Sequence, residues 1–89
     1  MHNPKIEVLI EGWRSEMLAN LQKWIAVPSV LAERAGEGKP FGGEVARMLD
    51  LALDTAREMG FEAENIDGYA GHVQMGSGAR TMGILAHLD

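Results

Sequence analysis

Residues 81–89 read TMGILAHLD, and this stretch decides the fold class. It holds four apolar residues that would point to both faces of an extended chain: Met82, Ile84, Leu85 and Ala86. A strand that is apolar on both faces is typical of an α/β sheet covered by helices on both sides. We therefore predict a strand over residues 81–86 and an α/β fold. His87 and Asp89 follow at its carboxyl end, where open α/β sheets form their ligand crevices.

Two shorter strands are predicted before this segment. Residues 61–66 alternate in polarity and lead to the turn pair Asp67 and Gly68. Residues 72–76 alternate again and lead to a second turn at Ser77 and Gly78. The sequence thus predicts three strands at its carboxyl end.

Two amphipathic helices are predicted to precede the strands. Residues 44–59 and 6–25 both carry apolar residues at three- and four-residue steps, which line one face of a helix. Gly60 is a typical C-terminal stop for the second helix. In the first helix, Pro4 suits the start and Pro28 the end, and Gly12 could mark a bend. The tryptophans and methionines lie mostly on these faces, so we expect them to fill a core.

Residues 28–43, between the helices, are rich in glycine, proline and charged residues. This composition predicts an exposed loop that is long for a compact domain, and such loops are often functional. The chain has two glycine-rich stretches, one in this loop at residues 36–39 and one at residues 76–78. Neither has the sequence surroundings of a phosphate-binding loop, so both are interpreted as turns.

The composition excludes several classes of protein. A chain of 89 residues allows one small domain or a piece of a larger one. Thirteen acidic and eight basic residues give a net charge of −5, which disfavours a nucleic-acid partner. No stretch approaches the roughly 18 apolar residues of a membrane span. The chain has no cysteine, so a metal would need histidine and carboxylate ligands. Without cysteine there can be no disulfide bonds, and we expect a cytoplasmic protein.

The sequence stops directly after His87 and Asp89, at the place where chemistry is expected. A central strand without later neighbours would leave unpaired backbone groups at its edge, which favours self-association. We therefore expect this chain to be the front part of a longer protein.

The triplet His87-Leu88-Asp89 places two polar side chains on one face of the predicted strand, about 7 Å apart along it. Imidazole is a good zinc ligand, and a carboxylate often accepts its other ring proton and orients it. His87 would then bind the metal and Asp89 would orient His87. Spacing alone leaves open an ordinary strand-end pair. The other histidines, His2 and His72, are expected to be solvated and are given no role.

Four stretches of the chain resemble one family. They are LQKWIAVPSV at residues 21–30, KPFGGEVARMLDLAL at 39–53, EMGFEAENIDGYAGHVQMGSG at 58–78 and MGILAHLD at 82–89. In order and spacing they resemble the N-terminal segment of bacterial dipeptidases of the dipeptidase V or Xaa-His (carnosinase-like) type. These belong to the zinc exopeptidases, with succinyl-diaminopimelate desuccinylase and aminoacylases.

The resemblance implies roles for two residues. His87 would be a ligand of one of two zinc ions, and Asp89 the catalytic-site carboxylate that orients it. Residues 1–89 would be the N-terminal part of a helix–sheet–helix catalytic domain, whose remaining ligands, general-base glutamate and lid domain lie downstream. The implied reaction is hydrolysis of a dipeptide by zinc-activated water.

Three functional hypotheses follow. The longer protein would be a zinc metallopeptidase acting on dipeptides, with a related amidohydrolase (deacylase or desuccinylase) as the alternative. The 89-residue chain alone would be inactive and would bind zinc weakly at most. A hypothesis of another class is a non-catalytic α/β module that associates through the edge of the predicted strand at residues 81–86.

Overall fold

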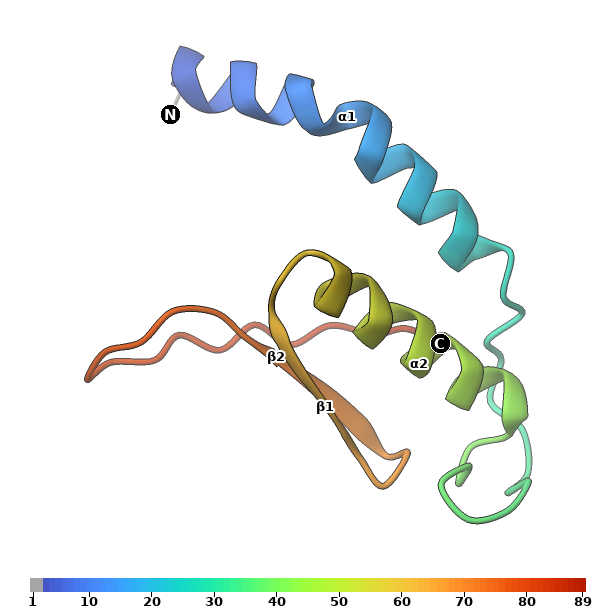
Figure 1. Ribbon diagram of the computed structural model, residues 1–89. Coiled ribbons are helices and arrows are strands. Elements are labelled where there is room, and N and C mark those ends of the chain that lie inside the picture. Colours follow the sequence, from blue (N-terminus) through green and yellow to red (C-terminus); the bar gives the residue numbers. More distant parts are fainter. Residues whose placement is uncertain (1–2) are drawn as a thin grey trace.

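The computed structural model describes residues 3–89, so His2 lies outside the described residues. The chain forms helix α1 (Pro4–Ile25), helix α2 (Gly43–Glu58), strand β1 (Glu62–Ile66) and strand β2 (Ala70–Gln74). Figure 1 shows α2 lying across the β1–β2 hairpin, while α1 extends away from them as a long arc. The α/β class, both helices and the first two predicted strands are confirmed.

Helix α1 begins at a well-formed cap. The Asn3 side-chain oxygen accepts hydrogen bonds from the amides of Lys5 and Ile6, at 3.0 and 3.4 Å, and Pro4 occupies the first turn. The helix is continuous through Gly12, so the bend considered there does not interrupt it.

The expected burial of the α1 stripe is wrong for this structure. No residue of α1 is buried, and Trp13 and Met17 are both more than half exposed. Amphipathic periodicity forms the helix, but burial needs a partner surface, and the described chain supplies one only near Trp24. There the indole N–H donates to the Thr55 hydroxyl of α2 at 3.2 Å.

Helix α2 carries the core. Its buried residues are Ala46, Met48, Leu49 and Leu53. Met48 is 2% exposed and is the only buried methionine among the described residues. The helix ends as predicted. Gly60 has a positive φ of 91°, its amide donates to the Arg57 carbonyl at 2.9 Å, and the Phe61 amide donates to the Ala56 carbonyl at 3.1 Å. These two bonds form a Schellman motif.

The two strands form an antiparallel hairpin. Their register pairs Glu62 with Gln74 and Ile66 with Ala70. Asp67 and Gly68 both have positive φ, at 54° and 79°, as the tight hairpin turns that use this residue pair require. At Gly71 an added Cβ would lie 2.8 Å from the Leu49 side chain, so glycine allows the hairpin to pack closely on α2.

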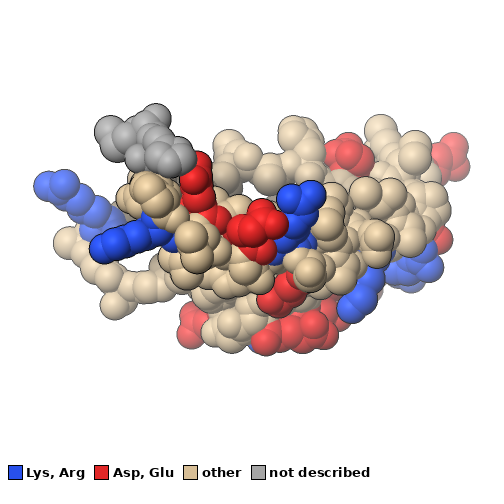
Figure 2. Space-filling model, turned by 90° about the horizontal axis from the view of Figure 1, so that it is seen from above, with Lys and Arg blue, Asp and Glu red and all other residues tan. Residues whose placement is uncertain are grey.

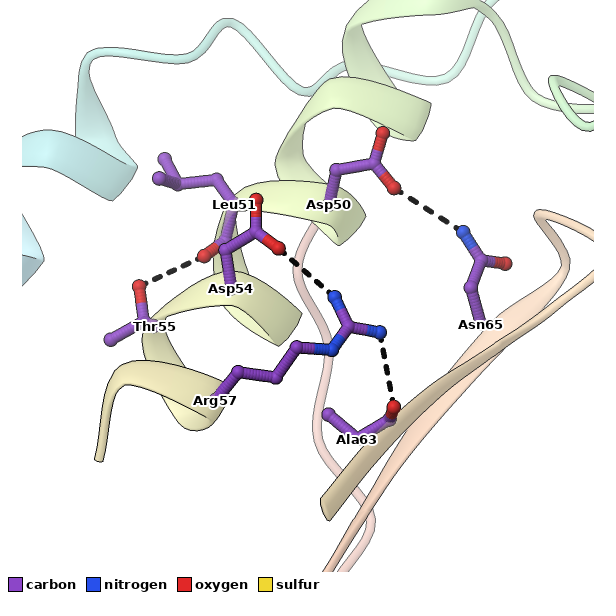
Figure 3. Close-up of polar contacts among 7 residues, drawn as sticks. All are labelled: Asp50, Leu51, Asp54, Thr55, Arg57, Ala63 and Asn65. Atoms are coloured by element: carbon purple, nitrogen blue, oxygen red, sulfur yellow. Dashed lines mark hydrogen bonds and ion pairs between the residues drawn. The ribbon is translucent and has the colours of Figure 1, made fainter. Parts of the chain in front are cut away.

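Polar contacts also join α2 to β1 (Figure 3). The Arg57 guanidinium pairs with Asp54 at 2.9 Å and donates to the carbonyl of Ala63 in β1 at 3.0 Å. The Asn65 amide donates to the Asp50 carboxylate at 3.4 Å. These contacts are exposed, so packing at Leu49 and Leu53 contributes most of the stability of this interface.

The third predicted strand, over residues 81–86, is wrong for this structure. These residues are extended but pair with no strand, and Ile84 and Leu85 are almost fully exposed. In Figure 1 the chain turns back after β2 and passes the hairpin to end beside α2. A strand forms only where a neighbour accepts and donates its backbone hydrogen bonds, and residues 3–89 place no such neighbour beside this segment.

Residues 28–42 form a loop with internal backbone hydrogen bonds, and Gly43, predicted to belong to the loop, is the first residue of α2. The two arms of the loop run antiparallel, with the Ala32 amide donating to the Phe41 carbonyl at 2.9 Å and the Ala35 amide to the Lys39 carbonyl at 3.0 Å. The loop packs against the hairpin turn where Gly38 meets Gly68, and a side chain at Gly68 would collide with the Gly38 carbonyl.

The chain exposes more surface than a compact domain of its mass. Its accessible surface is 7603 Å², whereas monomers of this mass expose about 5,100 Å². Its radius of gyration is 15.4 Å, against about 12 Å for a compact domain of this length. The difference reflects the uncovered stripe of α1 and the unpaired segment at residues 81–86.

The surface around α1 has mixed charge. Figure 2 shows blue basic and red acidic side chains interspersed on the face seen from above. Within the described residues, neither helix is long and apolar enough to cross a membrane.

Candidate functional site

The final segment of the chain borders a hollow in the body of the molecule. The hollow has a volume of about 330 Å³, and its walls come from the loop before α2, from α2, from the hairpin turn and from residues 86–89. The loop and the turn contribute Phe41 and Tyr69, whose rings meet edge to face with centroids 5.5 Å apart. The two predicted site residues, His87 and Asp89, therefore lie at the wall of a partly apolar hollow.

The structure brings His87 and Asp89 together. The His87 Nδ1 lies 3.3 Å from the Asp89 Oδ1, so the imidazole donates to the carboxylate when Nδ1 carries the proton. Their side chains are 94% and 56% exposed. An extended backbone places residues i and i+2 on one side of the chain, which is why this pair meets even though no strand has formed.

The donor set of this pair fits one part of a zinc site. A histidine that gives its Nδ1 proton to a carboxylate keeps Nε2 free as a metal ligand, and the carboxylate fixes the orientation of the ring. A structural or catalytic zinc site needs at least three protein ligands. Among the described residues, no group of three or more histidine and acidic side chains could hold a metal ion. The pair can supply one ligand and its orienting group, and the other ligands would have to come from elsewhere.

A second histidine–carboxylate pair lies outside the hollow. His72 in β2 faces Glu64 in β1, with the Nε2 nitrogen 3.1 Å from the carboxylate. The two residues are direct cross-strand partners, and the His72 side chain is 56% exposed. The prediction of a solvent-exposed His72 is confirmed. The pair has the same chemical groups as His87 and Asp89 in an open setting, which makes it a useful control.

Ser29 contacts the segment that carries the candidate pair, and the sequence did not predict this contact. Its hydroxyl donates to the Leu88 carbonyl at 2.7 Å, across 59 positions of the chain. A single serine in a loop has no periodicity or spacing that would mark it. It lies within the predicted loop at residues 28–43, whose composition does not single out any one side chain.

Comparisons with known proteins agree with the motifs. The chain is 35% identical to "Putative dipeptidase YtjP" of Bacillus subtilis, over 98% of this chain and 19% of that protein. It is 34% identical to the Beta-Ala-Xaa dipeptidase of Lactobacillus delbrueckii subsp. lactis, over 91% of this chain and 17% of that protein. No family model matches the chain, and no solved structure matches it.

The matched relatives are much longer than this chain, which spans about a fifth of their length. The similarity nonetheless covers nearly all of the 89 residues, including the four stretches on which the resemblance rests. The resemblance to bacterial dipeptidases inferred from those stretches is confirmed: this chain is similar to a segment of each of these two proteins.

Proposed function

We propose that this chain is the N-terminal part of the catalytic domain of a zinc-dependent dipeptidase. The observation that carries the proposal is the His87–Asp89 pair, 3.3 Å apart at the wall of a hollow, at the end of a segment that is homologous to dipeptidases. The substrate class is a dipeptide with a free amine. The cofactor is zinc, as two ions in the longer protein.

In this proposal His87 supplies one metal ligand through Nε2, and Asp89 accepts the Nδ1 proton and holds the ring in one orientation. Zinc, when bound, activates water for attack on the peptide carbonyl. The hollow offers apolar wall from Leu49 and the aromatic pair Phe41 and Tyr69, which would exclude water from a bound group. The general base and the remaining ligands belong to the rest of the domain.

The 89-residue chain by itself is proposed to be inactive, because one histidine and one orienting carboxylate neither hold two metals nor supply a base. Its partner is a dipeptide rather than nucleic acid or membrane, since a net charge of −5 repels a phosphate backbone. A cytoplasmic location, expected from the cysteine-free composition, is part of the same proposal.

The test uses the longer protein that carries this chain, loaded with zinc. His87→Ala should remove nearly all hydrolysis of a β-Ala-Xaa dipeptide and of an α-linked dipeptide, and should lower the zinc content without unfolding the protein. His72→Ala, which removes the other exposed histidine–carboxylate pair, should leave both unchanged. Full activity in His87→Ala would show that the ligand assignment is wrong.

The same protein distinguishes the close alternative, a related amidohydrolase. A deacylase or desuccinylase would hydrolyse N-acyl or N-succinyl amino acids faster than dipeptides. A preference for those substrates would replace the dipeptidase assignment and leave the role of His87 intact.

We propose a non-catalytic association module as the second candidate, because residues 81–86 are extended, unpaired and exposed. Such a segment can pair with a strand of another copy. A discrete dimer of the 89-residue chain in size-exclusion chromatography with light scattering would support this function. A monomer would contradict it.

A further inference from the structure

The chain beyond the hairpin turn is largely exposed, and its residues 86–89 border the hollow. Among residues 69–89, Leu88 is the only one that is not exposed. Its carbonyl accepts the 2.7 Å hydrogen bond from the Ser29 hydroxyl, and its neighbours on both sides are the two candidate site residues. The position of His87 and Asp89 therefore depends on how Leu88 is held.

Ser29 is presented from a stiff part of the loop. The Ser29 amide donates to the Val27 carbonyl and the Val30 amide to the Pro28 carbonyl, each at 2.8 Å. These are two successive three-residue turns, and the proline ring fixes one of their torsions. The hydroxyl is thus held in place before it meets Leu88, and ordering it costs little entropy.

We propose that Ser29 is a positioning residue for the candidate metal site. It does not touch the metal or the substrate. It binds the carbonyl of the peptide that links Leu88 to Asp89, and so holds the segment that carries the Asp89 carboxylate and the His87 ring against the hollow. The inference rests on the proposed function in one respect, that His87 binds zinc.

The proposal is tested on the isotope-labelled 89-residue chain by NMR, with Ser29→Ala, Ser29→Thr and Ser77→Ala compared. Ser77 lies in the exposed turn before the same segment and serves as the matched control. In Ser29→Ala the amide order parameters of residues 86–88 should fall from about 0.85 to below about 0.6, while those of α2 stay unchanged. Ser29→Thr keeps the hydroxyl and should restore them.

A zinc titration followed on the His87 ring signals gives the second readout. One neutral hydrogen bond corresponds to about 1 kcal/mol, so Ser29→Ala should raise the apparent Kd about fivefold, with Ser29→Thr close to the unchanged chain. Unchanged order and affinity in Ser29→Ala would overturn the inference. So would a loss of order without any change in affinity, or an equal effect of Ser77→Ala.

The two proposals can fail separately. If His87→Ala weakens zinc binding measured by calorimetry, which needs no His87 ring signal, and Ser29→Ala does not, the positioning role is wrong and the zinc assignment stands. If His87→Ala leaves zinc binding unchanged, the zinc assignment fails, and the positioning role fails with it.

Discussion

Replacing one leucine at a time tests where the core of this chain lies. Leu53 is 3% exposed between α2 and the hairpin, whereas Leu85, in the segment that was predicted as a strand, is 101% exposed. Leu53→Ala removes three buried carbons at roughly 0.8 kcal/mol each, or about 2.4 kcal/mol, before any cost of the cavity left behind. Leu85→Ala makes the same chemical change in water and should alter the free energy of unfolding by less than about 0.5 kcal/mol.

The assay is urea unfolding, followed by the NMR amide signals of α2 and the hairpin. With a slope of about 1 kcal/mol per molar urea for a chain of this size, Leu53→Ala should lower the midpoint by about 2 M, or abolish folding without urea. Leu85→Ala should leave the midpoint in place. A shift in Leu85→Ala as large as that in Leu53→Ala would refute the reasoning, because it would mean that residues 81–86 are buried in solution.

Two further predictions concern the helix ends. Gly60→Ala should destabilise the chain by about 1 kcal/mol in a thermal melt, because the backbone has a φ of +91° at this residue. Gly83→Ala is the control and should show no such loss. Its φ is not in the positive region, and no atom lies within 4 Å of an added Cβ. Trp24→Phe removes the 3.2 Å bond to Thr55 and should weaken the docking of α1 on α2 by about 1 kcal/mol. Faster amide exchange confined to the last turn of α1 would support this, and unchanged exchange would contradict it.

Local patterns were sufficient for the elements whose hydrogen bonds are local. Residues three and four apart make a helix at α1 and α2, and Gly60 ends α2 through bonds that span only a few residues. The same holds for the hairpin, because Asp67 and Gly68 can adopt the positive φ values of its turn. For these elements the sequence was enough to predict their type, and their boundaries to within two residues.

The candidate pair could also be predicted, and for a similar reason. His87 and Asp89 are two residues apart, so any extended backbone places them on one side, and the contact of 3.3 Å forms without a sheet. Spacing therefore predicted the contact between the two side chains, whereas the zinc-binding role of His87 came from the resemblance and is still a proposal.

Only the tertiary structure decided what each apolar face meets. The stripes of α1 and α2 have the same period, yet Met48 of α2 is buried and Trp13 of α1 is exposed, because packing depends on a second surface that the sequence pattern of one helix does not contain. The segment at residues 81–86 has the composition of a buried strand, but the described part of the chain offers it no strand to bond with. The hydrogen bond from Ser29 to Leu88 joins residues 59 positions apart, and such a contact exists only once the chain has folded.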